Sequence, residues 1–178
     1  VKPTQMVRNA VAEASRHNDD PAGAARPFDL ERDGEVFGEG AAAAVLESRT
    51  AAQRRGVPIL ANCAGFGNAF GRSADGGVTQ QAVENSILAA LRDAGLAPND
   101  VGAVFAFGRS TRAADQVEAA AIRATLGEVP VTVPKSYFGN LGSGGAAVDF
   151  VAAVLALQHR QIPPTLNYRV PDPACPVN

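Results

Sequence analysis

The chain has 178 residues, of which 46% are hydrophobic and 19% charged, and its formal net charge is −2. This composition is typical of a globular protein, and it excludes a disordered chain, a membrane-spanning protein and a protein that binds nucleic acid through general positive charge. Because two cysteines are too few for a disulfide scaffold, we expect a reducing, cytoplasmic compartment.

The first part of the chain is expected to contain two helices and two short strands. Apolar side chains at helical spacing predict helices over residues 5–16 and 49–55, the second ending at the glycine that follows it. Prolines and a glycine mark residues 19–29 as a loop. The apolar runs 41–46 and 59–66 predict buried strands.

The second part of the chain alternates helices with strands. Helices are predicted over residues 80–94, 113–126 and 146–160, and strands over residues 101–107 and 129–133. The last helix has almost no polar face, so we expect it to be buried on most sides. The alternation indicates an α/β layered fold with a mainly parallel sheet.

Four isolated features of the sequence do not indicate a functional site. Gly65-Phe66-Gly67 resembles the start of a dinucleotide-binding motif, but the third glycine is misplaced. Leu141 breaks the nucleophile-elbow pattern around Ser143. The two histidines, His17 and His159, have no second metal ligand at fixed spacing. We interpret Cys63 as a small core residue rather than a nucleophile.

Short motifs with a shared order and spacing cover nearly the whole chain. They are Pro27-Phe28-Asp29, Arg32-Asp33-Gly34, Gly38-Glu39-Gly40-Ala41-Ala42, Ala90-Leu91-Arg92-Asp93-Ala94-Gly95, Gly108, Ser110, Thr111, Asp115, Glu118, Lys135-Ser136, Gly139, Pro163-Pro164-Thr165-Leu166-Asn167 and Pro171-Asp172-Pro173. Together they resemble the signature of the β-ketoacyl-acyl-carrier-protein synthases, or ketosynthases. So many motifs in register make this resemblance a strong signal.

The resemblance implies a thiolase-like α/β fold, in which two related halves stack into five layers, α-β-α-β-α. Residues 1–48 would be the end of the N-terminal half, and residues 49–178 would be the C-terminal half, incomplete at its C-terminus. The segment with the nucleophilic cysteine would then precede Val1. Neither Cys63 nor Cys175 matches the position of that nucleophile.

The chain departs from the family at the two catalytic histidines. In an active ketosynthase of this type, two histidines polarise the malonyl thioester and stabilise the enolate formed on loss of carbon dioxide, and a cysteine carries the acyl group. Here Phe107 and Asn140 stand at the two histidine positions. Asn140 keeps an N–H donor, as in related condensing enzymes that use cysteine, histidine and asparagine. Phe107 has none, and losing one oxyanion donor costs on the order of 10²- to 10³-fold in rate. We therefore expect this site to be inactive.

Charged residues around these positions match supporting residues of the family. Asp115 and Glu118, three apart on a helix, are predicted to receive Lys135 in a buried ionic cluster, the alternative being an exposed cluster of no consequence. Arg109 replaces the family's usual threonine. It is expected to fill the vacated pocket and pair with Asp115 or Glu118, or else to reach across a dimer interface.

Three functions are compatible with the resemblance. The one that we expect is a degenerate subunit, like the chain-length factor of type II polyketide systems, which partners an active ketosynthase in polyketide or fatty acid chain elongation. The alternatives are an active acyltransferase that condenses malonyl-acyl-carrier protein with an acyl thioester in a decarboxylative Claisen reaction, and a non-enzymatic module that binds acyl carrier protein.

The expected partners follow from the same resemblance. They are acyl carrier protein, which carries the substrate on its phosphopantetheine, and either an active ketosynthase in a heterodimer or a second copy in a homodimer. No cofactor, metal, nucleic acid or membrane is expected to bind.

Overall fold

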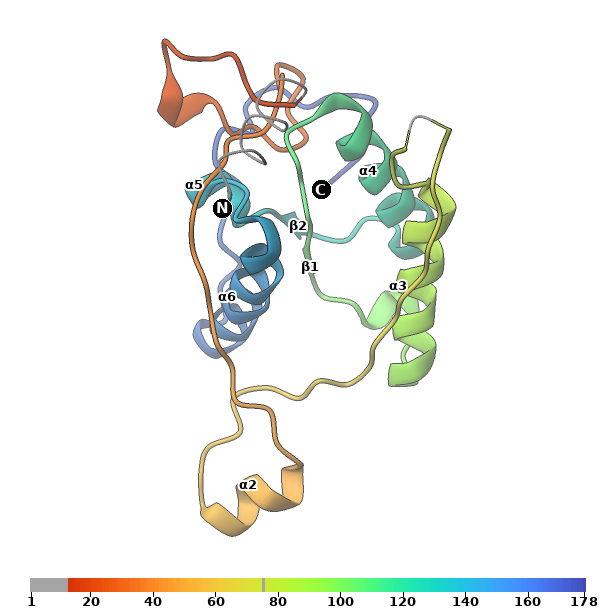
Figure 1. Cartoon of the computed structure of the whole chain (residues 1–178). Coiled ribbons are helices and arrows are strands. Elements are labelled where there is room, and N and C mark those ends of the chain that lie inside the picture. The colour runs from red at the N-terminus through yellow and green to blue at the C-terminus, as the bar shows by residue number, and fades with distance from the viewer. Residues whose placement is uncertain (1–12, 75) are drawn as a thin grey trace.

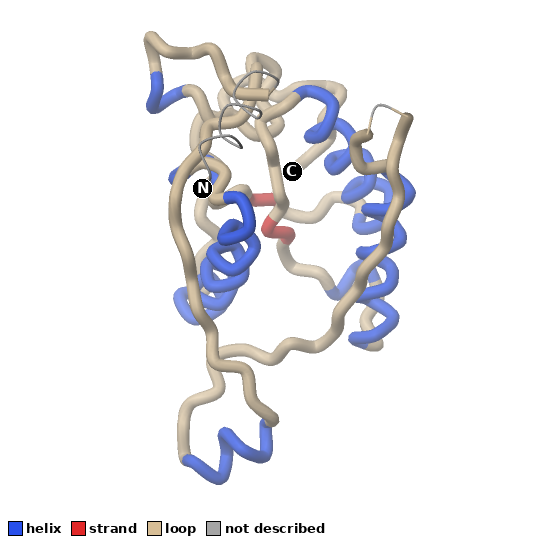
Figure 2. Tube along the Cα trace, viewed as in Figure 1, coloured by secondary structure: helices blue, strands red, loops and turns tan. Residues whose placement is uncertain are grey.

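The computed structural model describes residues 13–74 and 76–178, and it places two short strands between two groups of helices (Figure 1). The elements in chain order are η1 (Pro21–Gly23), α2 (Arg49–Arg55), α3 (Gln80–Ala94), η2 (Pro98–Asp100), β1 (Val104–Phe105), α4 (Arg112–Leu126), β2 (Val131–Thr132), α5 (Lys135–Phe138), η3 (Gly142–Gly144) and α6 (Gly145–His159), where η denotes a single 3₁₀ turn. Helices α3 and α4 lie on one side of the strands and α5 and α6 on the other, while α2 stands apart (Figure 1). Long loops connect these elements (Figure 2).

The predicted helices α2, α3 and α4 are confirmed. Local capping groups explain where they begin or end. The hydroxyl of Thr79 accepts a hydrogen bond from the backbone N–H of Ala82 at the start of α3. Gly95 ends α3 with φ 67°, and Gly56 ends α2 with the same φ, in the left-handed region that glycine adopts readily. Gly127 ends α4. Helices α3 and α4 pack against each other and form one side of the structure.

The two strands are parallel neighbours joined by α4. Val104 lies opposite Val131 and Phe105 opposite Thr132. A parallel pair needs a crossover connection, and α4 supplies it. The predicted strands 101–107 and 129–133 are therefore confirmed at their centres, and so is the parallel α/β arrangement, although each strand is shorter than predicted.

The hydrophobic core lies where α4 and β2 meet the loop that contains Phe28. Its buried members are Phe28, Ala106, Ala119, Ile122, Val129, Val133 and Cys175. Ala119 and Val133 are completely buried, at 0% exposure. This core fixes the positions of β1 and β2, from whose ends the candidate site is built.

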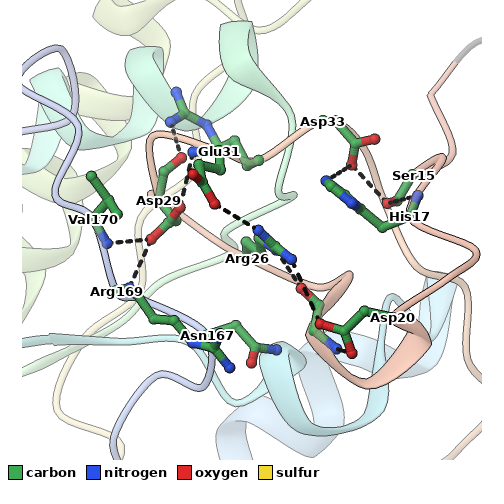
Figure 3. Close-up of polar contacts among 12 residues, drawn as sticks. Ser15, His17, Asp20, Arg26, Asp29, Glu31, Asp33, Asn167, Arg169 and Val170 are labelled. Carbon is green, nitrogen blue, oxygen red and sulfur yellow. Dashed lines mark hydrogen bonds and ion pairs between the residues drawn. The ribbon is translucent and has the colours of Figure 1, made fainter.

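Polar contacts hold residues 20–32, the early loop, against residues 167–178, the C-terminal segment, beside this core (Figure 3). One oxygen of Asp29 accepts the backbone N–H groups of Arg169 and Val170 at 2.7 Å each, and the other accepts that of Glu31 at 2.9 Å. Burial acts to raise the pKa of Asp29, but these hydrogen bonds and the charge of Arg26 hold it below its usual value. The ionised carboxylate is therefore the form that fastens the two segments.

Two predicted strands are wrong. Residues 41–46 and 59–66 are extended but have no strand partner in the described part of the chain, and their side chains are largely exposed, with Val45 at 84% and Phe66 at 74%. An apolar run forms a strand only where a neighbouring strand satisfies its backbone N–H and C=O groups. Neither of these two runs has such a neighbour among the described residues. Cys63 is accordingly exposed, so its interpretation as a core residue is also wrong.

Helix α6 is confirmed, but its predicted burial is wrong. Only Gly145 is buried along it, whereas Phe150 is 41% and Leu157 67% exposed. The helix contacts η3, which directly precedes it in the chain, and β1. None of the helices in the described residues is both long and apolar enough to cross a membrane.

The predicted helix 5–16 lies mostly outside the described residues. Its last part, residues 13–16, is described and is not helical. Ala14 forms a parallel bridge with Glu35 instead, because the backbone N–H of Ser15 donates to the carbonyl of Glu35 at 2.8 Å. A long-range backbone pairing here overrides the local helical pattern.

Candidate functional site

The candidate site forms where the carboxyl ends of β1 and β2 meet. The chain leaves β1 through Phe107 and Gly108, and it leaves β2 toward Lys135 at the start of α5. In parallel α/β sheets, ligand sites form outside the carboxyl ends of the strands. The topology therefore brings the two sequence positions of interest, Phe107 and Asn140, to one edge.

The backbone at Phe107 is held from two directions. Glu118, on α4, accepts the backbone N–H of Phe107 at 2.7 Å and that of Gly108 at 2.8 Å. The Nζ of Lys135 donates to the carbonyl oxygen of Phe107 at 2.6 Å. Burial raises the pKa of Glu118, while the hydrogen bonds from Gly108 and Phe107 and the charge of Lys135 oppose the rise.

The ring of Phe107 lies under the same lysine. The Lys135 Nζ is 3.4 Å from the ring centroid, a cation–π contact, while Phe107 itself is 47% exposed. Lys135 is only 3% exposed, and burial lowers its pKa, although the charges of Asp149 and Glu118 raise it. The side chain at position 107 is thus an aromatic ring with no proton to give.

The predicted cluster of Asp115, Glu118 and Lys135 is wrong as a single unit. Asp115 faces Arg32 instead, with 3.4 Å between its Oδ2 and the arginine Nε, and it accepts the backbone N–H of Phe28 at 2.9 Å. Asp115 is completely buried, so the alternative of an exposed cluster is wrong as well. Burial is the main cause that raises the pKa of Asp115 to about 6.

Arg32, behind the site, makes contacts that the sequence did not reveal. It is completely buried, and its Nη1 pairs with Asp172 at 2.7 Å. Its other acceptors are the carbonyls of Asp29, Thr111 and Arg112 and the sulfur of Cys175. The guanidinium therefore joins the early loop, α4 and the C-terminal segment behind the site. The Arg32-Asp33-Gly34 motif singled out this arginine in the sequence but did not show that its side chain is buried.

Arg109 does not pair with Asp115 or Glu118, so that prediction is wrong. Its Nε donates to Glu35 and its Nη2 to Glu13, which the sequence did not single out. Burial acts to lower the pKa of Arg109, but the two carboxylates raise it above its usual value. These partners belong to its own chain, and a reach across a dimer interface stays a prediction.

Asn140 is bound to the same carboxylate. Its Nδ2 donates to the Oε2 of Glu35 at 2.8 Å, and its Oδ1 accepts the backbone N–H of Gly142 at 3.0 Å. Its backbone bridges to the loop before it, since its N–H donates to the carbonyl of Val36 at 2.7 Å and its carbonyl accepts from Gly38 at 3.0 Å. Both ends of the amide are therefore engaged.

A small open pocket lies between these residues. It encloses about 190 Å³ with its mouth included, and it is lined by Ala25, Pro27, Val36, Gly108, Arg109, Ser110, Lys135, Gly139 and Asn140. Neither histidine nor cysteine lines it. His17 lies 3.8 Å from Asp33, and His159 ends α6. No cluster of metal-ligating side chains occurs among the residues that the structure describes.

Replacing Glu118 by glutamine should loosen the backbone at Phe107 and Gly108. Glutamine keeps one acceptor oxygen but turns an amide toward the second backbone N–H, so one buried donor loses its partner. We expect the free energy of unfolding to fall by about 1–3 kcal/mol in the full-length protein. Urea unfolding measures it, and Glu84→Gln, on the exposed hydrogen bond from Gln80 to Glu84, is the control. Equal stability of the two variants would contradict the prediction.

Comparison with known proteins places this geometry in a family. Residues 60–169 match the family described as beta-ketoacyl synthase, C-terminal domain. The chain is 41% identical over 177 residues to the tetracenomycin polyketide synthase ketoacyl synthase alpha subunit of Streptomyces glaucescens, and 40% identical over 178 residues to 3-oxoacyl-[acyl-carrier-protein] synthase 2 of Coxiella burnetii. These matches cover 94% and 93% of this chain but 41% and 42% of the relatives.

Solved structures agree with the sequence relatives. The ishigamide ketosynthase/chain length factor matches with a TM-score of 0.91 and 32% identity, over 99% of this chain and 43% of that one. A type II polyketide acyl-carrier protein in complex with its ketosynthase bound to the hexaketide matches with a TM-score of 0.85 and 31% identity, over 99% of this chain and 45% of that one. The chain thus has the thiolase-like ketosynthase fold and covers its C-terminal half, as predicted.

Proposed function

The chain belongs to the β-ketoacyl synthase family, and we propose that it is part of a chain-length-factor-like subunit that partners an active ketosynthase in chain elongation. One observation carries the proposal. The first histidine position holds Phe107, whose ring lies under the Lys135 ammonium and has neither a hydrogen-bond donor nor a charge. Decarboxylation of a malonyl thioester needs a donor that stabilises the developing enolate, and a phenyl ring supplies none.

The scaffold around that position is kept although the imidazole is absent. Glu118 accepts the backbone N–H of Phe107, and Lys135 donates to its carbonyl oxygen. A subunit whose task is to complete a dimer needs this folded framework but not the chemistry. The assignment of residues 1–48 to the N-terminal half and 49–178 to the C-terminal half is part of the proposal, and the family match over residues 60–169 supports it.

The proposed partners are an active ketosynthase and an acyl carrier protein, acting in the cytoplasm. One structural relative is a ketosynthase/chain length factor, and another is a ketosynthase with its acyl-carrier protein. The substrate would be carried on the phosphopantetheine of the carrier protein, so the subunit itself would need no cofactor.

The test compares the full-length protein alone with the same protein co-expressed with an active ketosynthase. We expect a one-to-one heterodimer by native mass spectrometry. The protein alone should condense malonyl-carrier protein at least about 10²-fold more slowly than the heterodimer. As a control, replacing the nucleophilic cysteine of the partner should abolish condensation by the heterodimer. Condensation by the protein alone, with an acyl group on one of its own cysteines, would overturn the proposal.

A second candidate function is an active condensing enzyme. It is favoured by the names of the sequence relatives, which include a ketoacyl synthase alpha subunit at 41% identity. It requires a cysteine at the nucleophile position of the full-length protein and another donor in place of the first histidine. The acyl-enzyme measurement in the same experiment separates the two candidates.

A further inference from the structure

A buried carboxylate, that of Glu35, stands between two donor side chains that line the pocket, Arg109 and Asn140. Glu35 is only 3% exposed, and both of its oxygens are used. Its Oε1 accepts from the Nε of Arg109, and its Oε2 accepts from the Nδ2 of Asn140 at 2.8 Å. A buried carboxylate needs such partners, because an unpaired charge in this position would be strongly destabilising.

The position of Glu35 is fixed by its backbone, independently of its side-chain partners. Its N–H donates to the carbonyl of Glu13 at 2.6 Å, and its carbonyl accepts the N–H of Ser15 at 2.8 Å. The next carbonyl, that of Val36, accepts the backbone N–H of Asn140 at 2.7 Å. The carboxylate is therefore presented from a junction of three hydrogen-bonded backbone segments.

The two donors differ in what else holds them. Asn140 is tied a second time through its Oδ1, which accepts from Gly142. Arg109 is tied a second time through Glu13, but that carboxylate is 44% exposed, whereas the side chain of Glu35 is 2% exposed. Because an exposed ion pair contributes little, Glu35 should be the partner that decides where the guanidinium lies.

We propose that Glu35 is a positioning residue that locks Arg109 and Asn140 against the wall of the pocket, and so withdraws both donors from the space where a thioester carbonyl would be held. The inference rests on the proposed function and deepens it. The site would be closed to chemistry by an added carboxylate, besides having lost an imidazole. Asn140, which could otherwise act as in the enzymes that use asparagine, would then be a structural residue.

Arginine modification by phenylglyoxal, mapped by peptide mass spectrometry on the full-length protein, tests the lock. In the wild type, Arg109 should react more slowly than the exposed Arg54. In Glu35→Gln we expect the rate at Arg109 to rise about tenfold, the change that corresponds to losing one charge-assisted hydrogen bond. Arg32 is an internal control, because a completely buried arginine stays unmodified while the fold is intact.

Two matched variants make the result specific. Glu13→Gln removes the exposed carboxylate and should raise the rate at Arg109 about twofold at most. Glu128→Gln removes the surface partner of Arg123, whose Nη2 lies 2.8 Å from the Glu128 carboxylate. It should also change the modification rate at Arg123 by about twofold at most. If Glu35→Gln exposes Arg32, the shorter Glu35→Asp replaces it and should give an intermediate rise.

An unchanged rate at Arg109 in Glu35→Gln or in its replacement Glu35→Asp, or an equal rise in Glu13→Gln, would overturn the lock. None of these rates depends on condensation. An active full-length protein would therefore overturn the proposed function without touching this result, and the reverse also holds.

Discussion

Replacing Arg32 by methionine is expected to lower the free energy of unfolding by about 3–5 kcal/mol in the full-length protein. Methionine fills much of the same volume but leaves two carboxylates, Asp115 and Asp172, without the cation that faces them at 3.4 and 2.7 Å. A domain of ordinary stability has about 5–15 kcal/mol in total, so this loss would remove much of it. Urea unfolding followed by far-UV circular dichroism measures the change.

The matched control is Arg123→Met. Arg123 pairs with Glu128 at 2.8 Å, which is shorter than the distance between Arg32 and Asp115. Both side chains of this control pair are exposed, however, Arg123 at 43% and Glu128 at 73%. We expect it to lose no more than about 1 kcal/mol, because exposed ion pairs are solvated and screened. Should Arg32→Met be too unstable to purify, Arg32→Lys, which keeps the charge but loses the fork of donors, should give a smaller, measurable loss. Similar losses in Arg32→Met and Arg123→Met would contradict the prediction.

The helices were predictable from the sequence because their signals are local. Thr79 before α3 and Gly95 after it act within one turn of the helix, so the residues alone identify the boundaries. The apolar run 41–46 was not predictable in the same way. Its burial depends on a neighbour far along the chain, and in the described residues no strand pairs with it.

In the candidate site, too, local features were predictable from the sequence and long-range contacts were not. Motif spacing singled out Phe107 and Asn140, and the structure brings these two residues to one edge. The spacing did not give their partners, since Glu35 lies 105 residues from Asn140 and 74 from Arg109. Which carboxylate faces which cation is decided by the packing of distant segments. The predicted pairing of Lys135 with Asp115 and that of Arg109 with Asp115 or Glu118 failed for that reason.

Phe107 and Asn140 are held in place by different contacts. At Phe107 the backbone N–H and carbonyl are held by Glu118 and Lys135, and the ring adds a cation–π contact with the same lysine. At Asn140 the side chain itself is the bonded group, through Glu35. A change at position 107 would therefore remove the cation–π contact and leave the backbone acceptors in place, whereas a change at position 140 would remove the bonded group itself.

Asp115 should make the protein less stable as the pH rises from about 4.5 to about 7.5, relative to Asp115→Asn, by about 2 kcal/mol. Burial raises the pKa of Asp115 to about 6 in the folded protein, while the usual pKa of an aspartate side chain is 3.8. Between these values the folded state binds more protons than the unfolded state, so the free energy of unfolding falls as the pH increases. Ionising a buried carboxylate at neutral pH therefore opposes folding even beside Arg32.

The asparagine variant isolates this group from the other carboxylates of the protein. Asp29 and Asp172 have lowered pKa values, and they change stability with pH in the opposite direction in both proteins, so their contribution cancels in the difference. Urea unfolding of both proteins at the two pH values measures that difference. A wild-type protein that gains stability over its Asp115→Asn variant with rising pH would show that the Arg32 charge outweighs desolvation and holds Asp115 ionised. The buried arginine would then be a net electrostatic stabiliser of the early loop, rather than the partner that a carboxylate buried by packing requires.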